Sequence, residues 1–321
     1  MRNFFQRTGK FRPRTGEDDR NDQQAIPEDL WVKCPKCGEL IYSRELERNL
    51  QVCPKCGHHF RLRARERIAQ LIDPGTFVEW DTALRPEDPL RFVDGQGPYS
   101  DKIVKTQKKT GEIEALISGT GTIDGRRAVI LVSDWDFLGA SMGSVWGEKM
   151  SRAIERAIEQ RLPVVTVNAS GGARMHEGLF SLMQMAKTIA SFEALGRARL
   201  PHLSLLVDPC YGGVTASYAT VADVVMAEPE AKIGFAGRRV IEQAIKQKLP
   251  KEFQTAEFML EHGTIDLICP RAEVRETLAT LIDLYGGPAE AASAPEPAII
   301  TAATIAPATA TTAAMTGSED R

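Results

Sequence analysis

Residues 162–175 decide the fold of this chain, and they read Leu-Pro-Val-Val-Thr-Val-Asn-Ala-Ser-Gly-Gly-Ala-Arg-Met. The first half of this stretch is apolar and β-branched, which predicts a buried strand over 162–168. Apolar residues at helical spacing follow and predict a helix over 176–195. Gly171 and Gly172 therefore lie at a strand-to-helix turn, where backbone N–H groups favour an oxyanion. A plain tight turn would need the same glycines, so this motif alone leaves both interpretations open.

The pattern occurs a second time further along the chain. A strand is predicted over 203–207, Gly212 and Gly213 follow it, and a shorter helix is predicted over 214–222. Two such turns suit a reaction that builds negative charge on two oxygen atoms. The candidate catalytic groups are therefore the backbone N–H groups of four glycines: Gly171, Gly172, Gly212 and Gly213.

Short strands and helices alternate along the rest of the chain, which predicts an α/β fold. The further predicted helices are 65–73, 99–110, 148–161, 240–248, 253–261 and 271–285, and a hairpin is predicted over 115–133. The sequence contains neither a dinucleotide-binding fingerprint nor a Gly-x-Ser-x-Gly nucleophile motif. A glycine-rich loop over 139–147 precedes one helix and is a weak phosphate-binding signal, since it lacks the P-loop spacing.

Four cysteines near the N-terminus form two Cys-Pro-Lys-Cys-Gly motifs, Cys34 to Cys37 and Cys53 to Cys56. A pair of thiolates two residues apart, followed by a glycine, aims both sulfurs at one ion. Four thiolates at this spacing suit tetrahedral zinc, and a shell filled by cysteine makes that zinc structural. His58 and His59 are then expected to be surface or packing residues.

The residues around this motif are basic, and Arg61, Arg63 and Arg65 alternate along the chain. In an extended segment they share one face. One interpretation is a solvated surface, and the other is a patch for the phosphates of a nucleic acid or a cofactor. The sequence favours the solvated surface, because no aromatic residues are interleaved for base stacking.

The composition is that of an ordinary globular protein of 321 residues, with 43% hydrophobic residues and a net charge of −3. This charge gives no general attraction to nucleic acid or anionic membranes. No apolar run is long enough to span a bilayer and no signal-peptide core is present, so a cytoplasmic location is expected. We expect four segments: a flexible leader over 1–29, a zinc ribbon over 30–60, a main domain over 61–288 and a disordered tail over 289–321.

Together, these motifs resemble the β subunit of the bacterial-type acetyl-coenzyme A carboxylase carboxyltransferase. The resemblance covers roughly residues 30 to 285. It is carried by the four cysteines, Gly143-Ser144, Ser170 to Met175, Gly212-Gly-Val-Thr-Ala-Ser217 and Ile233-Gly-Phe-Ala-Gly237.

The resemblance implies a crotonase-like spiral of ββα units behind an N-terminal four-cysteine zinc ribbon. It further implies transfer of a carboxyl group from N-carboxybiotin to acetyl-CoA, giving malonyl-CoA for fatty-acid synthesis. The biotin would be attached to a separate biotin carboxyl carrier protein, which biotin carboxylase loads. A separate α subunit would share the active site in an α2β2 assembly.

The resemblance also assigns candidate substrate-binding residues: Gly143, Ser144, Arg174, Gly237 and Arg238. For Arg174, pairing with a CoA phosphate and locking the turn both remain open, and the structural role is favoured. A carboxyltransferase acting on another acyl-CoA and a nucleic-acid-binding zinc ribbon are the alternative functions.

Three departures from the family pattern occur, at His176, at the pair Cys210-Tyr211 and at Arg238. His176 stands where the family usually has Gln, and a hydrogen-bonding substitute is favoured over a general base. Cys210 and Tyr211 replace smaller residues, and Cys210 is expected to be a packing residue. Arg238 replaces a Pro, where it alters loop stiffness or adds a phosphate contact.

Overall fold

The computed structural model describes residues 30–286, and the predicted leader (1–29) and the predicted tail (289–321) lie outside this range. The strands are β1 (Trp31–Lys33), β2 (Leu40–Tyr42), β3 (Val78–Trp80), β4 (Val93–Asp94), β5 (Gly97–Pro98), β6 (Leu116–Ile123), β7 (Arg126–Ser133), β8 (Val164–Ser170), β9 (His202–Tyr211), β10 (Val224–Ala227), β11 (Ile233–Gly234) and β12 (Leu267–Ile268). The α-helices are α1 (Ser43–Arg48), α2 (Ala64–Leu71), α3 (Tyr99–Thr110), α4 (Ser144–Gln160), α5 (Leu179–Arg197), α6 (Gly212–Thr215), α7 (Arg238–Ile245), α8 (Ala256–Glu261) and α9 (Val274–Gly286). Short 3₁₀ turns are η3 (Leu138–Ala140), η4 (Met175–Glu177) and η5 (Tyr218–Thr220).

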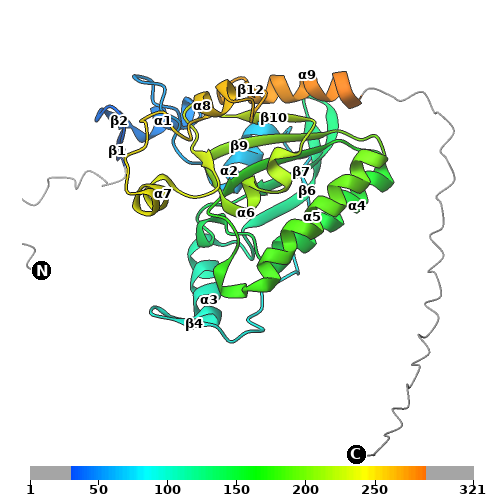
Figure 1. Ribbon diagram of the computed structural model, residues 1–321. Coiled ribbons are helices and arrows are strands. Elements are labelled where there is room, and N and C mark those ends of the chain that lie inside the picture. The colour runs from blue at the N-terminus through cyan, green and yellow to red at the C-terminus, as the bar shows by residue number, and fades with distance from the viewer. Residues whose placement is uncertain (1–29, 287–321) are drawn as a thin grey trace, which may run out of the picture. The chain divides into compact units, whose positions relative to one another are not determined.

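A mixed sheet organises these elements, with strand order β12-β10-β9-β8-β7-β6-β3 and β11 paired to the end of β9 (Figure 1). Strands β7 to β10 and β12 run parallel, while β6 and β3 are antiparallel additions at one side. The carboxyl ends of neighbouring parallel strands meet at one edge of a sheet, which is where ligands bind in α/β folds. Both Gly-Gly motifs follow such carboxyl ends, those of β8 and β9.

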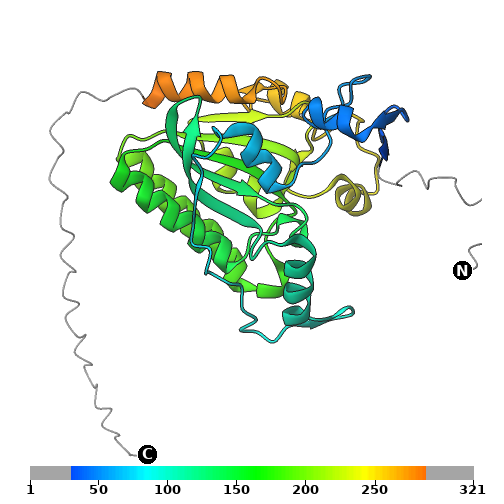
Figure 2. The same cartoon turned by 180° about the vertical axis from the view of Figure 1, so that it is seen from behind.

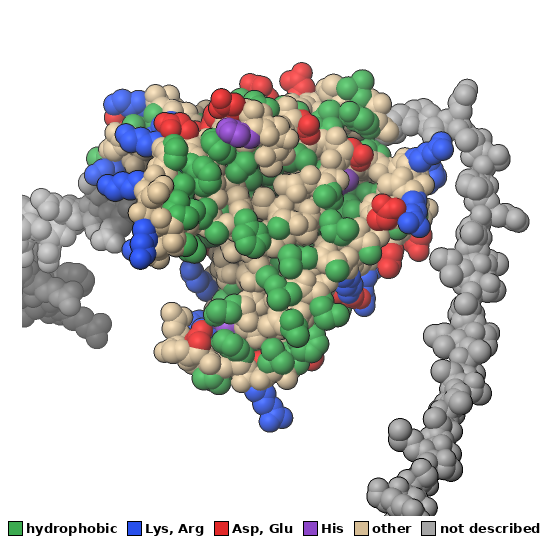
Figure 3. All heavy atoms as spheres, in the orientation of Figure 1, with side chains coloured by type: hydrophobic (Ala, Val, Ile, Leu, Met, Phe, Trp, Pro, Cys, Tyr) green, Lys and Arg blue, Asp and Glu red, His purple; other side chains and the backbone are tan. Residues whose placement is uncertain are grey.

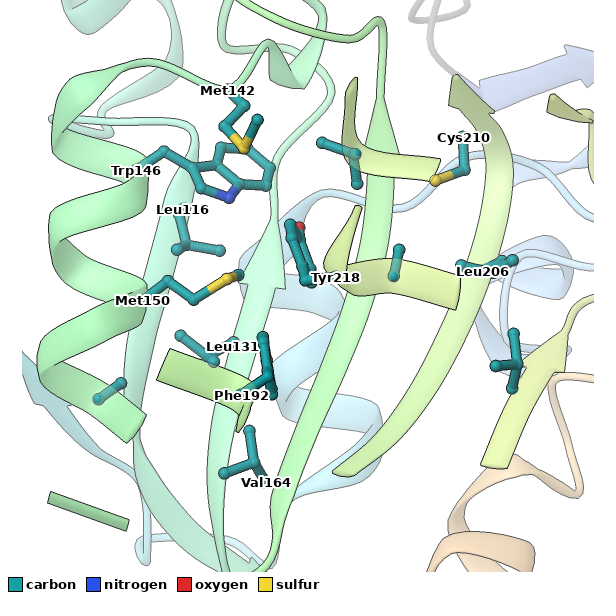
Figure 4. Packing of buried hydrophobic residues seen from close by; sticks show 14 of the residues in the cluster. Leu116, Leu131, Met142, Trp146, Met150, Val164, Phe192, Leu206, Cys210 and Tyr218 are labelled. Carbon is teal, nitrogen blue, oxygen red and sulfur yellow. The ribbon is translucent and has the colours of Figure 1, made fainter. Parts of the chain in front are cut away.

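Helices cover both faces of the sheet, as the opposite views in Figures 1 and 2 show, with α4 and α5 on one face and α2 and α9 on the other. Strand β7 shows why, because its side chains alternate between the two layers. Val129 and Leu131 pack in the α4/α5 layer, whereas Ile130 and Val132 pack in the α2/α9 layer. Figure 4 shows the first layer, where Trp146 of α4 lies against residues of the sheet and of η5.

Most predicted elements are present, with shifted ends. Helix α3 begins and ends at the predicted residues, and it stops at Gly111, whose φ of 75° fits a left-handed cap. The helix predicted over 214–222 is wrong in length, because α6 ends at Thr215 and a separate 3₁₀ turn follows. The helix predicted to begin at 176 begins at Leu179, after η4 and Gly178.

Candidate active site and zinc centre

The two Gly-Gly motifs lie in direct contact. A Cβ added to Gly212 would stand 2.7 Å from the Cα of Gly172, and one added to Gly172 would stand 3.3 Å from the Cα of Gly212. Both residues have positive φ, 110° for Gly172 and 64° for Gly212. No other residue type allows this approach of two backbones, so the expectation of two neighbouring turns is met by the geometry.

Three of the four predicted N–H donors are already hydrogen-bonded inside the chain. Gly171 donates to the carbonyl of Gly139 (2.8 Å), Gly172 to the hydroxyl of Ser170 (3.0 Å) and Gly212 to the carbonyl of Phe235 (2.8 Å). These bonds correct the expectation that Gly171, Gly172 and Gly212 offer their N–H groups to a substrate. What these glycines contribute is the close approach of the two backbone segments, which the lack of a side chain allows.

Two neighbouring N–H groups, those of Ala173 and Gly213, find no acceptor within residues 30–286. Ala173 lies opposite Met142 in a short parallel bridge, which holds the chain extended after Gly172. The strand-to-helix turn predicted there is therefore wrong, although it is correct for Gly213, which lies in the first turn of α6. Ala173 was not among the predicted site residues.

Arg174 is fully buried and serves as a structural anchor, the favoured one of its two expected roles, so it does not pair with a phosphate of CoA. Its guanidinium pairs with the carboxylates of Glu114 and Glu177 and donates to the carbonyl of Ser141 at 2.7 Å. Although burial opposes the charged form, the Glu114 carboxylate holds the pKa of Arg174 above its usual range. The hydroxyl of Tyr99 completes the cluster by donating to Glu177 at 2.7 Å.

Gly143 and Ser144 lie at the start of α4, beside this anchor. A Cβ on Gly143 would lie 2.5 Å from a carboxylate oxygen of Glu177, so no side chain fits there. The N–H of Ser144 donates to the other carboxylate oxygen of Glu177 at 2.6 Å. An internal carboxylate thus caps this helix start and occupies the N–H of Ser144, and the assignment of Gly143 and Ser144 to substrate binding stays a prediction.

Gly237 and Arg238 lie at the start of α7, on the segment that follows β11. The guanidinium of Arg238 pairs with Glu242 at 3.1 Å and donates to the carbonyls of Leu249 and Lys251. Arg238 therefore ties the loop that follows α7 to the first residue of that helix. Of the two roles expected for Arg238, this contact fits a change in loop stiffness. Gly237 has open space around its Cα.

Cys210 takes the packing role that was expected, and His176, expected to be a hydrogen-bonding substitute for Gln, packs against an aromatic ring beside Lys102. The ring of His176 stacks on Tyr99 with centroids 4.8 Å apart, and burial lowers the pKa of His176. Its Nε2 lies 3.5 Å from the amine of Lys102. Cys210 is fully buried, and burial raises its pKa to about 12, which suits a packing residue and not a nucleophile.

The side chains of the four predicted metal ligands converge, so that their sulfur atoms could bind one ion. The sulfurs of Cys34, Cys37, Cys53 and Cys56 all lie within 4.8 Å of one another. The two motifs have matching backbones, because the glycine after each donates to the carbonyl of the motif's first cysteine, at 2.9 and 3.0 Å. Within residues 30–286 no fifth ligand joins these four thiols, which fit a structural zinc ion and would hold it in a tetrahedron.

The basic residues that follow the zinc module, as we call residues 30–60, are engaged within the chain. Arg61 pairs with Asp208 (3.2 Å), Arg63 with Asp134 (3.0 Å) and Arg65 with Glu112 (2.7 Å). Each positive charge thus has a carboxylate partner. The arrangement favours the solvated-surface interpretation over a phosphate-binding patch.

Sequence reasoning did not single out Glu114, Glu177 or Tyr99, which hold Arg174 in place. Glu177 carries a weak signal, because it stands three residues after Arg174. Glu114 and Tyr99 are distant in sequence, and no pattern connects them to the motif. Among residues 30–286, no helix is both long and apolar enough to cross a bilayer.

Two family models match the chain. Residues 59–301 match the carboxyl transferase domain, and residues 31–56 match the acetyl-CoA carboxylase zinc finger domain. The acetyl-coenzyme A carboxylase carboxyl transferase subunit β of Chloroflexus aggregans is 57% identical over 89% of this chain and 92% of its own length. The corresponding subunit of Herpetosiphon aurantiacus is 50% identical over 91% of this chain and 96% of its own length.

Solved structures with the same fold include the transcarboxylase 12S and a hetero-dimer of Pseudomonas malonate decarboxylase. The first has a TM-score of 0.58 and 24% identity over 70% of this chain and 41% of its own. The second has a TM-score of 0.52 and 24% identity over 68% of this chain and 85% of its own. They bear out the expected crotonase-like carboxyl transferase fold, and with its two matching domains and close relatives the chain belongs to the family of acetyl-coenzyme A carboxylase carboxyl transferase β subunits.

Proposed function

We propose that this chain is the β subunit of an acetyl-CoA carboxyltransferase and that its two glycine turns present N–H donors to the reacting oxygens. The observation that carries the proposal is the contact between Gly172 and Gly212. Because of this contact, Ala173 in the extended segment after Gly172 and Gly213 in the first turn of α6 lie close together at the carboxyl edge of the sheet, and neither N–H finds an acceptor among residues 30–286.

The chemistry requires donors where negative charge develops. Removing a proton from the acetyl methyl group places negative charge on the thioester oxygen, and release of carboxylate from carboxybiotin places it on the ureido oxygen. Backbone N–H groups held by a rigid scaffold stabilise such charge without reorganising. The freed biotin nitrogen then takes the methyl proton, so the site needs no side-chain base.

The partners follow from the same proposal. An α subunit would complete the site, and a biotin carboxyl carrier protein, loaded by biotin carboxylase, would deliver the carboxyl group in the cytoplasm. Support comes from the face shown in Figure 3, where apolar side chains gather over α5, α6 and α7. The exposed apolar residues of this face include Leu179, Leu182, Met183, Phe235 and Val240. A surface of this kind is typical of a protein interface.

Reconstitution tests the proposal. The zinc-loaded chain is mixed with acetyl-CoA, carboxylated biotin carrier and the α subunit of a relative, and malonyl-CoA is measured. We expect formation of malonyl-CoA only when the α subunit is present. Full activity of the chain alone would contradict a shared site, and faster turnover of a longer acyl-CoA would favour the alternative substrate.

A substitution tests the donor. In Gly213→Leu the new Cβ would lie 2.9 Å from the sulfur of Met185, so the side chain crowds the turn. Leu keeps the backbone N–H, but crowding moves it away from the reacting oxygen, so we expect kcat to fall at least 100-fold, as when one oxyanion donor is removed. Gly196→Leu is the matched control, because Gly196 lies on α5 in open space. Equal kcat in the two variants would remove Gly213 from the site.

A further inference from the structure

A buried ionic cluster joins the zinc module to the sheet. The guanidinium of Arg271 forms a two-pronged pair with Glu228, with Nε–Oε1 at 2.9 Å and Nη2–Oε2 at 2.7 Å. The same guanidinium donates to the carbonyls of Leu50, Gln51 and Phe60 in the zinc module. All the N–H groups of the Arg271 guanidinium are therefore hydrogen-bonded, and both carboxylate oxygens of Glu228 accept hydrogen bonds.

A second guanidinium, that of Arg67 on α2, shares the same carboxylate. Its Nη2 lies 2.7 Å from Oε1 of Glu228, and the residue is 3% exposed. Its Nη1 is buried and finds no acceptor among residues 30–286. Burial lowers the pKa of Arg67, as expected for a cation that is only partly compensated. The guanidinium of Arg67 therefore shares its only carboxylate in the cluster with Arg271, and one of its nitrogen donors has no hydrogen-bond acceptor among the described residues.

A cavity of about 20 Å³ lies beside Arg67. This volume accommodates one particle of about the size of a water molecule. The charged groups that line it are Arg61, Arg67, Arg271, Asp208 and Glu228. Three guanidinium groups face two carboxylates, so the lining carries one positive charge in excess.

We propose that this cavity binds a small monovalent anion of halide size, chloride in the cell, next to Nη1 of Arg67. A water molecule would satisfy the orphaned donor but not the excess charge, whereas an anion meets both. The ion can enter from a neighbouring cleft of about 810 Å³, because the cleft and the cavity share His59, Arg61, Asp208 and Glu228 in their linings. Such an ion stabilises the contact between the zinc module and the sheet.

Thermal unfolding of the zinc-loaded full chain tests this proposal, with sodium chloride compared to sodium gluconate at equal ionic strength. An ion that binds only the folded state multiplies the ratio of folded to unfolded protein by about eleven at ten times its Kd. We expect a higher Tm in chloride that saturates with concentration. Equal Tm in the two salts overturns the proposal.

Two variants make the comparison specific. Arg67→Met leaves the pair between Arg271 and Glu228 intact and balances the lining charges, so it should fold and show the same Tm in both salts. Arg48→Met removes an exposed arginine of the zinc module and should keep the full chloride effect. If Arg67→Met keeps the chloride effect, the ion binds elsewhere and the proposal is wrong.

Anomalous diffraction from crystals soaked in bromide needs no variant. We expect a bromide peak in the cavity within contact of the Arg67 guanidinium. A water molecule there, with no anomalous signal, would overturn the proposal even if Arg67→Met failed to fold.

Discussion

Glu177 accepts a hydrogen bond from the backbone N–H of Ser144 at 2.6 Å, so a carboxylate from η4 caps the first turn of α4. The same side chain accepts from Tyr99 and pairs with Arg174. One carboxylate therefore connects α3, α4 and the segment that carries Ala173. The rigidity that the proposed donors require comes from this buried cluster and not from the glycines themselves.

We expect Glu177→Gln to lower the free energy of unfolding by about 1–3 kcal/mol, because the buried carboxylate accepts hydrogen bonds from Ser144, Tyr99 and Arg174, whereas an amide has one oxygen and leaves a donor unsatisfied. Urea unfolding followed by circular dichroism measures the change. Glu193→Gln is the control, since Glu193 forms an exposed pair with Arg197 that contributes at most about 1 kcal/mol. A loss below 1 kcal/mol for Glu177→Gln would show that the network is not a stabilising anchor.

The sequence predicts those features of the fold and the site that depend on residues close together in the chain. The four zinc-binding cysteines, the hairpin over 115–133 and the bounds of α3 were predicted, because each depends on residues near one another in the chain. The occupied donors could not be predicted in this way, because the acceptor of Gly171 is a carbonyl of Gly139, which comes from a different loop. Similarly, the partner of Arg174 is Glu114, 60 positions earlier. Long-range pairing decides whether a glycine N–H is free, and a motif alone does not contain that information.

We expect Gly212→Ala to abolish carboxyl transfer. Its new Cβ would lie 2.7 Å from the Cα of Gly172, which is backbone and cannot move aside easily, and a φ of 64° adds about 1–2 kcal/mol of strain. The measurement is malonyl-CoA formation in the reconstituted assay together with thermal unfolding. Gly196→Ala should keep the activity and gain about 0.5–1 kcal/mol of stability, because Gly196 lies in a helix with free space. Normal activity of Gly212→Ala would contradict the tight contact.

Removal of zinc should unfold the zinc module before the sheet. The four thiols hold two tight turns whose backbone bonds are few, and zinc binding supplies much of the folding free energy of such modules. Hydrogen exchange during treatment with a chelator should show loss of protection at Gly38 and Gly57 first, while β7 to β9 stay protected. Arg271 would then lose its carbonyl partners in the module, so a later fall in Tm of the main domain is expected. Loss of transfer activity while zinc is still bound would contradict this order.

His202 predicts how stability depends on pH. The ring is buried against Phe192, and burial lowers the pKa of His202 to about 3 from an ordinary value near 6.5. Between these two values the unfolded chain binds a proton that the folded chain does not, so this group makes stability fall as the pH drops below about 6.5. The slope it contributes is about 1.4 kcal/mol per pH unit. His202→Gln should remove this slope while Thr166 keeps a hydrogen-bonding neighbour in place of the ring nitrogen. Urea unfolding at several pH values between 4 and 7 measures the difference, and parallel curves for the two proteins would show that His202 becomes protonated without unfolding.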